Sequence, residues 1–203
     1  YATGAAWNAP HHEKMLYDNA QLASVYLEAY RASGDPAFAR VARETLDYLL
    51  RDLARPGGGF YTAEDADEEY YSLTSAEARA RRARPRRDDK ILAGHNGLAL
   101  SALANGARIL SEPRYLAAAR ETARFLRANL YDEKAGRLDR RWRDGERGGP
   151  GFAEDYAFTV AGLLDLHEAG SDPEWLSWAT RLAEAQLALF YDAKTGDYYS
   201  TAA

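Results

Sequence analysis

An internal repeat limits what this chain can fold into. An acidic residue followed by proline occurs three times, at Asp35-Pro36, Glu112-Pro113 and Asp172-Pro173. Pro113 follows Pro36 by 77 positions, and Pro173 follows Pro113 by 60. The same two offsets separate three glycines, Gly59, Gly136 and Gly196. Self-similarity of this kind indicates repeated supersecondary units, so we expect three structural copies.

Each copy contains two helical patterns of different character. The second pattern begins at the acidic residue and proline, which favour the N-cap and first position of a helix. It carries one apolar stripe, which in the first copy consists of Phe38, Val41, Ala42, Leu46, Leu49 and Leu53. The first pattern is apolar on more than one side, as residues 91–107 and 157–164 contain no charged residue. A helix that is apolar all round is buried, so inner and outer helices are expected to alternate.

The connections between these helices also alternate. Inner-to-outer links are short, whereas residues 54–90, 131–152 and 191–203 are long and rich in Gly, Tyr and charge. We therefore predict an all-α fold, an α/α-toroid fragment with three αα-hairpins of a six-hairpin barrel and short β-ribbons in the outer-to-inner loops. Residues 1–203 are expected to form one partial domain, with the remaining hairpins outside this chain. A solenoid of the TPR kind is the alternative, although its repeats are shorter, about 34–47 residues.

Composition excludes several classes of site and partner. The formal net charge is −5, which provides no general positive field for nucleic acid. No cysteine is present, so disulfides and thiolate chemistry are excluded. The longest uncharged run, residues 91–107, is shorter than the about 20 residues that span a bilayer. We expect a cytoplasmic protein with no bound cofactor and no metal.

The repeat offsets bring polar residues to equivalent positions at the starts of the inner helices. They relate Asp18 to His95 and Asp155, and they relate Asn19 to Asn96 and Tyr156. Tyr17 and Glu154 each lie one residue before this series. In a toroid these side chains would form an arc on one lip of the cavity, where carboxylates and an imidazole suit acid–base chemistry. The alternative is ordinary helix capping, which also places Asp and Asn at helix starts.

Two further groups lie in the segments that precede the inner helices. Trp7, His11, Glu13 and Lys14 come just before the first inner helix. Glu64, Asp65 and Asp67 follow a glycine-rich turn in the first long loop, and they could form a carboxylate pair, a cation site or a solvated loop. Adjacent His11 and His12 do not have a zinc-site spacing.

The segment from Arg79 to Arg87 contains six arginines. A nucleic-acid patch is one reading of this composition. No aromatic residue is interleaved with the arginines, so we favour a solvated loop instead.

Four ordered motifs resemble one known family: PHHEKMLYDNAQL at 10–22, GGFYTAEDAD at 58–67, DDKILAGHNGL at 88–98, and FAEDYAF followed by GLLDL at 152–166. They are similar to the thioredoxin-domain proteins related to spermatogenesis-associated protein 20. This resemblance implies an N-terminal thioredoxin-like domain outside this chain and a toroid similar to N-acylglucosamine 2-epimerases and six-hairpin glycosidases. The chain departs from the family at His12 and His95, where Phe and Trp are usual, and its loop after Asp67 is shorter.

The function expected from these observations is carbohydrate chemistry, either epimerisation or isomerisation, or glycoside hydrolysis. The predicted catalytic residues are His11, Asp18, Glu64 and Asp155. The predicted substrate-binding residues are Trp7, Glu13, Lys14, Tyr17, Asn19, Asp65, Asp67, His95, Asn96, Glu154 and Tyr156. The alternatives are a non-catalytic scaffold that serves the thioredoxin-like domain and a metal-dependent cyclase that uses Asp65 and Asp67.

Overall fold

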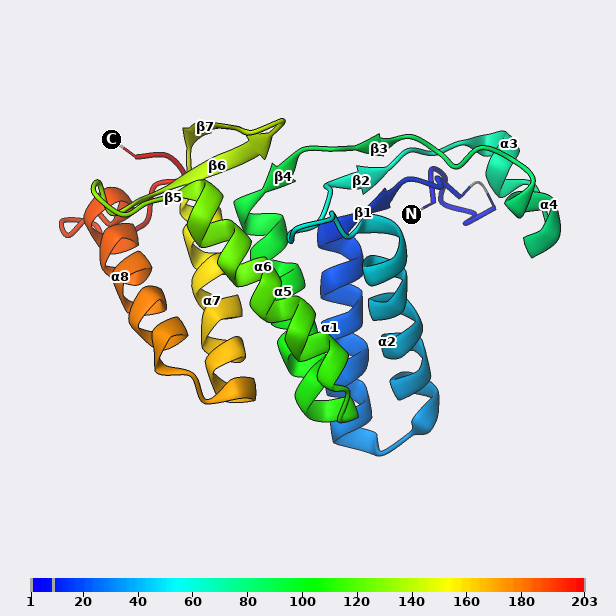
Figure 1. Cartoon of the computed structure of the whole chain (residues 1–203), viewed down its shortest axis with the longest axis horizontal. Helices are drawn as coiled ribbons and strands as arrows, with labels where there is room; N and C mark the ends of the chain where they lie inside the picture. The colour runs from blue at the N-terminus through cyan, green and yellow to red at the C-terminus, as the bar shows by residue number, and fades with distance from the viewer. Residues whose placement is uncertain (1, 9, 203) are drawn as a thin grey trace.

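Three helical hairpins form the body of the molecule in the computed structural model, which describes residues 2–8 and 10–202. Figure 1 shows the long helices side by side, with the short links at one end and the strands and long loops at the other. The first hairpin consists of α1 (Leu16–Ser33) and α2 (Pro36–Tyr48), which continues as a π-helical turn, η1 (Leu49–Leu53). The second consists of α5 (Ala93–Leu110) and α6 (Pro113–Leu130), and the third of α7 (Ala153–Gly170) and α8 (Pro173–Phe190).

The predicted alternation of inner and outer helices is confirmed. The inner helices α1, α5 and α7 pack against one another in that order, and α2, α6 and α8 each pack against the inner helix of the same hairpin. The central helix α5 is the most enclosed, with ten buried residues in its 18. The solenoid alternative is wrong, because the hairpins belong to the α/α-toroid class of fold.

The prolines begin the outer helices as the sequence predicts. Pro36, Pro113 and Pro173 occupy the first turn of their helices. The Asp35 and Asp172 carboxylates accept hydrogen bonds from the N–H groups of residues two positions later, which caps α2 and α8. Glu112 makes no such cap, and its longer side chain instead pairs with Arg43 of α2 and thereby ties two hairpins together.

Helices α5 and α7 approach closely because glycines face each other between them. A Cβ atom at Gly97 would lie 2.5 Å from the backbone carbon of Phe158, and one at Gly162 would lie 2.5 Å from the Gly97 carbonyl oxygen. Both distances are far inside van der Waals contact. The two backbones can therefore adopt this spacing only when neither residue has a side chain.

Short strands connect the long loops at one end of the hairpins. One sheet has the order β1 (Lys14–Met15), β2 (Ala63–Glu64) and β3 (Arg87–Asp88), and the other has the order β4 (Ile91–Leu92), β6 (Arg137–Arg143) and β5 (Tyr131–Asp132), with β7 (Glu146–Pro150) on β6. All pairs are antiparallel. The predicted ribbon in the second long loop is present as β5, β6 and β7. In the first loop the predicted ribbon is present as β2 and β3, and β2 also pairs with β1, which joins that loop to the start of the first inner helix.

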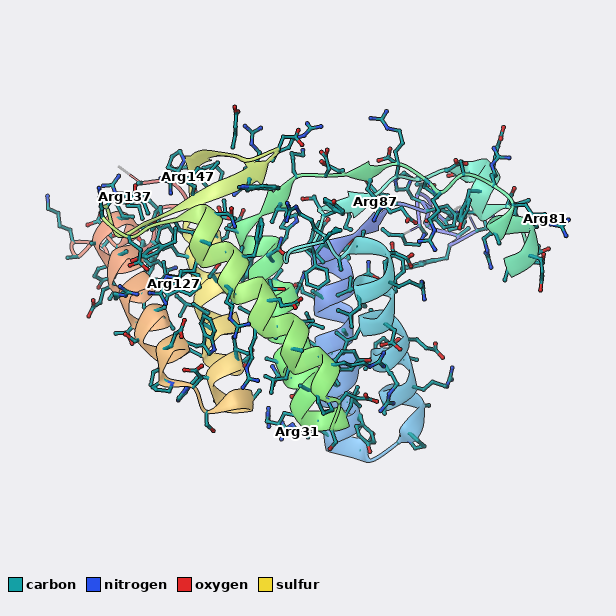
Figure 2. All side chains as sticks on the ribbon, viewed as in Figure 1. Arg31, Arg81, Arg87, Arg127, Arg137 and Arg147 are labelled. Carbon is teal, nitrogen blue, oxygen red and sulfur yellow. The ribbon has the colours of Figure 1, made fainter. Side chains whose placement is uncertain are left out.

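Two short helices in the first long loop were not predicted. These are α3 (Glu68–Tyr71) and α4 (Ala76–Ala80), which extend away from the hairpins (Figure 1). The arginine-rich segment that follows is partly anchored, because Arg84 donates to the Asp52 carboxylate and Arg87 donates to the Asp52 carbonyl at 2.9 Å. Arg81 points outward from the tip of this lobe (Figure 2). Within the described residues, no helix combines the length and apolarity needed to cross a membrane.

Candidate functional site

Two adjoining hollows lie at the loop end of the inner helices. The larger hollow has a volume of about 860 Å³, and its wall is formed by Trp7, residues 10–15 and the first turns of α1. The smaller hollow has a volume of about 300 Å³ and lies among the first turns of α1, α5 and α7. Tyr17 and Gln21 line both hollows. The residues of the predicted arc therefore line two hollows that share a wall, with Asp18 on the larger hollow and with His95 and Asp155 on the smaller one.

Asp18 is the least engaged carboxylate of this arc. It is half-buried in the first turn of α1 and lines the larger hollow. Among the residues that the structure describes, none donates a hydrogen bond to its carboxylate or forms an ion pair with it. Its charge acts on His95, whose protonated form it favours. A half-buried carboxylate on the wall of a hollow can exchange a proton with a bound molecule.

The segment before α1 supplies further polar groups to the larger hollow. His11 Nε2 lies 3.5 Å from Glu13 Oε2, and each side chain is about one-third exposed. The Lys14 ammonium donates to the His12 carbonyl at 2.6 Å and lies 3.8 Å above the Tyr71 ring. Burial lowers the pKa of Lys14, and the nearby Glu64 and Glu68 carboxylates partly oppose this shift. Lys14 is thus held by contacts within the protein, and His11 and Glu13 contact each other while about one-third of each side chain is exposed.

His95 occupies the first turn of α5 and lines the smaller hollow. Its ring packs against Tyr17 with 5.0 Å between centroids, and its buried Nδ1 atom has no hydrogen-bond partner among the described residues. Burial lowers the pKa of His95, and the carboxylates of Asp155, Glu154 and Asp18 only partly counter that effect. The imidazole is therefore neutral at pH 7, and a neutral imidazole is able to accept a proton.

Asp155 makes more contacts within the protein than Asp18 does. Only 2% of it is exposed, and its carboxylate accepts hydrogen bonds of 2.9 Å from three donors: Gly94 N–H, Phe152 N–H and Arg140 Nη1. It thus caps its own helix, α7, and also holds the start of α5. Glu154 shares the same arginine at 3.0 Å but is 55% exposed on the wall of the smaller hollow. The capping alternative considered for this series therefore describes Asp155 better than it describes Asp18.

The residues of the second equivalent series form hydrogen bonds with the backbone; they are Asn19, Asn96 and Tyr156. Asn96 is fully buried, and it accepts from Phe60 N–H at 2.7 Å and donates to the Phe60 carbonyl at 3.1 Å. The Tyr156 hydroxyl accepts from Leu138 N–H at 2.8 Å, and Asn19 donates to the Met15 carbonyl at 2.7 Å. Asn96 and Tyr156 lie outside both hollows, so we assign them a structural role rather than ligand binding. Asn19 lines the larger hollow.

The acidic residues of the first long loop also lie outside both hollows. Glu64 is 6% exposed and accepts a hydrogen bond from the Tyr71 hydroxyl. The Asp67 carboxylate caps α3 by accepting from Tyr70 N–H at 2.8 Å, and the Asp65 N–H bonds the Arg86 carbonyl. Within the described part of the chain, no group of three or more His, Asp or Glu residues has the arrangement needed to hold a metal ion. A cyclase-like cation site at Asp65 and Asp67 therefore has no further ligand there.

Sequence reasoning missed four residues of the smaller hollow: Gln21, Gly94, Leu98 and Phe158. Phe158 is 36% exposed although it lies in an otherwise apolar run. Its spacing of four residues from Glu154 on α7 places both on one helix face, and this is the signal that could have identified it.

A third hollow of about 700 Å³ lies on the outer helices α6 and α8. Its charged residues pair largely with one another, since Arg127 bonds both Glu133 and Glu174, and Arg147 bonds Asp132. Arg127 extends from α6 toward α8 in Figure 2. Because these groups neutralise each other, we do not treat this hollow as the functional site.

Similar proteins are known both by sequence and by structure. No family model matches the chain. Spermatogenesis-associated protein 20 of Homo sapiens is 31% identical and that of Rattus norvegicus is 30% identical, each over all of this chain. The chain spans 39% of the length of each of these relatives.

The solved structures that resemble the chain have an α/α-toroid fold. The structure of cellobiose 2-epimerase from Bacillus thermoamylovorans B4167 superposes with a TM-score of 0.78 and 12% identity. The match covers 93% of this chain and 48% of the epimerase chain. For a sugar epimerase from a ruminal bacterium, the match covers 94% of this chain and 48% of the epimerase chain, with a TM-score of 0.78 and 13% identity. For unsaturated glucuronyl hydrolase from Bacillus sp. GL1, the match covers 95% of this chain and 52% of the hydrolase chain, with a TM-score of 0.71 and 20% identity. At these identities the likeness establishes the fold.

Proposed function

We propose, for a chain that is homologous over its whole length to spermatogenesis-associated protein 20, that the two hollows bind a carbohydrate and carry out acid–base chemistry on it. The reaction would be epimerisation or isomerisation, or glycoside hydrolysis. The fold is shared with sugar epimerases and a glucuronyl hydrolase, which supports this class of substrate.

One observation carries the proposal. Two titratable groups of different type, the Asp18 carboxylate and the His95 imidazole, come from neighbouring inner helices and line adjoining hollows. Neither side chain forms a hydrogen bond with another described residue. The His95 ring packs against the Tyr17 ring, and this contact leaves its Nδ1 atom without a hydrogen-bond partner there. In this proposal Asp18 and His95 exchange protons with the substrate, each from its own hollow.

The surrounding side chains suit sugar binding. His11, Glu13 and Lys14 supply donors and acceptors for hydroxyl groups on the larger hollow, and Glu154 does the same on the smaller one. Trp7 is 81% exposed beside the larger hollow and offers an aromatic face. A few polar groups set among apolar and aromatic side chains are typical of small-molecule sites.

A sugar-library thermal-shift screen on the full-length protein tests this proposal. We expect at least one sugar to raise the melting temperature of the wild type, and we expect the shift to be lost or strongly reduced in Asp18→Asn. The control is Asp144→Asn, which changes an 83% exposed carboxylate on the β6–β7 turn and should leave the shift unchanged. Equal shifts in wild type and Asp18→Asn would remove Asp18 from the site.

A second candidate function is a non-catalytic scaffold that partners a thioredoxin-like domain in a longer protein. It is favoured by the engagement of two predicted catalytic carboxylates, since Asp155 bonds Arg140 and Glu64 bonds the Tyr71 hydroxyl. This candidate requires that no sugar stabilises the wild type. It also requires that substitutions on the hollow walls leave the activity of the thioredoxin-like domain in the full-length protein unchanged.

A further inference from the structure

We infer that the ligand is an uncharged saccharide of at least two sugar units, with one unit in each hollow and the linkage passing over Tyr17. This inference rests on the proposed function and adds to it the size and the charge of the substrate.

The first support is the division of the site by a shared wall. Tyr17 and Gln21 line both the larger and the smaller hollow, so a molecule that fills both must cross these two side chains. Gln21 donates to the Tyr17 carbonyl at 3.1 Å, and the Tyr17 ring leans on His95. These contacts hold the wall in place. Volumes of about 860 and 300 Å³ also fall within or at the edge of the range of about 300–1,000 Å³ that pockets for small ligands usually have.

The second support is that each hollow has its own aromatic residue and its own polar residues. The larger hollow combines Trp7 with His11, Glu13 and Asp18. The smaller one combines Phe158 with His95 and Glu154. An aromatic face beside hydroxyl-binding groups suits one sugar ring, so this composition, found twice, indicates two ring-binding subsites rather than one.

The conformation of Trp7 agrees with a binding role. Its φ angle is +57°, in the left-handed region that bulky residues rarely adopt, and 81% of the side chain is exposed. The Trp7 N–H donates to the Gly4 carbonyl at 3.1 Å, so this φ angle belongs to a turn. The turn leaves the indole ring exposed beside the larger hollow, where a sugar ring could stack on it.

The third support is the charge of the walls. Glu13 and Asp18 line the larger hollow, whereas Glu154 and Asp155 on the smaller one both pair with Arg140. The one lysine on these walls, Lys14, is held by the His12 carbonyl and the Tyr71 ring, and His95 is neutral because it is buried. An anionic sugar, such as a uronate or a sugar phosphate, would meet the Glu13 and Asp18 carboxylates in the larger hollow. The walls therefore select against it and leave neutral saccharides.

Isothermal titration of the full-length protein with matched sugars tests this inference. The pairs are glucose and cellobiose, mannose and β-1,4-mannobiose, and N-acetylglucosamine and chitobiose, with glucuronate as the charged probe. We expect at least one disaccharide to bind about tenfold or more tightly than its own monosaccharide, and glucuronate to bind more weakly than glucose.

Two variants locate the subsites. Trp7→Ala alters the larger hollow, and Phe158→Leu removes a flat ring from the smaller hollow while it keeps apolar bulk against α5. Each variant should lower disaccharide affinity, and at most one should lower monosaccharide affinity. Leu187→Ala, a change at a 50% exposed residue on the outer helix α8, is the matched control and should alter neither affinity.

The outcomes separate this inference from the proposed function. If every monosaccharide binds as tightly as its disaccharide, or if glucuronate binds more tightly than glucose, the inference is overturned while carbohydrate binding stands. If no sugar of the panel binds, the proposed function fails together with the inference. Full disaccharide affinity in both aromatic variants would also refute the two-subsite arrangement.

Discussion

Replacing Asp155 with alanine should destabilise the fold far more than its position on a hollow would suggest. The carboxylate is 2% exposed and accepts 2.9 Å hydrogen bonds from Gly94 N–H at the start of α5, from Phe152 N–H at the start of α7, and from Arg140. One substitution therefore removes support from two inner helices and one loop.

The expected loss in the free energy of unfolding follows from these contacts. Loss of a helix cap costs about 1 kcal/mol. The buried Gly94 N–H would lose its acceptor, which costs about 1–3 kcal/mol. Arg140 keeps Glu154 as a partner, so its contribution is small. The sum is about 2–4 kcal/mol for Asp155→Ala, and Asp155→Asn should lie between this variant and the wild type because its side-chain oxygen still accepts a hydrogen bond.

Urea unfolding of the full-length protein, followed by circular dichroism, measures this cost. The midpoint should fall while the slope of free energy against urea stays constant. Glu154→Ala is the control, because it removes a 55% exposed carboxylate from the same arginine and should change stability by about 0–1 kcal/mol. An Asp155→Ala midpoint equal to that of Glu154→Ala would refute the structural role of Asp155.

Three further predictions concern helix packing and titration. Gly97→Ala should destabilise by about 1–3 kcal/mol in the same unfolding assay, because its Cβ would lie 2.5 Å from the Phe158 backbone, which cannot rotate away. Burial raises the pKa of Asp165, so its ionisation opposes folding; Asp165→Asn should stabilise the protein at pH 7, and this gain should vanish below the ordinary aspartate pKa. Burial lowers the pKa of His95, so the unfolded chain binds more protons and stability should fall as the pH drops below about 6.5. Unfolding titrations between pH 7 and 5 should show a shallower fall for His95→Gln, and identical slopes would contradict the burial effect.

The fold could be predicted from the sequence because its signals are local and repeated. Pro36, Pro113 and Pro173 each begin an outer helix because proline fits the first turn, where its missing N–H costs nothing. Uncharged runs identified the buried inner helices, since a charged residue on a fully enclosed face would be costly. The short helices α3 and α4 were missed, because helices of four or five residues leave almost no periodic pattern.

The sequence by itself determined the order of the helices, the alternation of inner and outer positions, and the end at which the polar residues gather. Only the tertiary structure decided which of those polar residues remain open to a ligand. Asp18 and Asp155 are equivalent in the repeat, yet Asp18 lines a hollow without a hydrogen-bond donor among the described residues, whereas Asp155 binds Arg140 and two backbone N–H groups. The physical reason is that Arg140 and Gly94 reach Asp155 from distant parts of the chain, and helical periodicity carries no information about contacts of that kind.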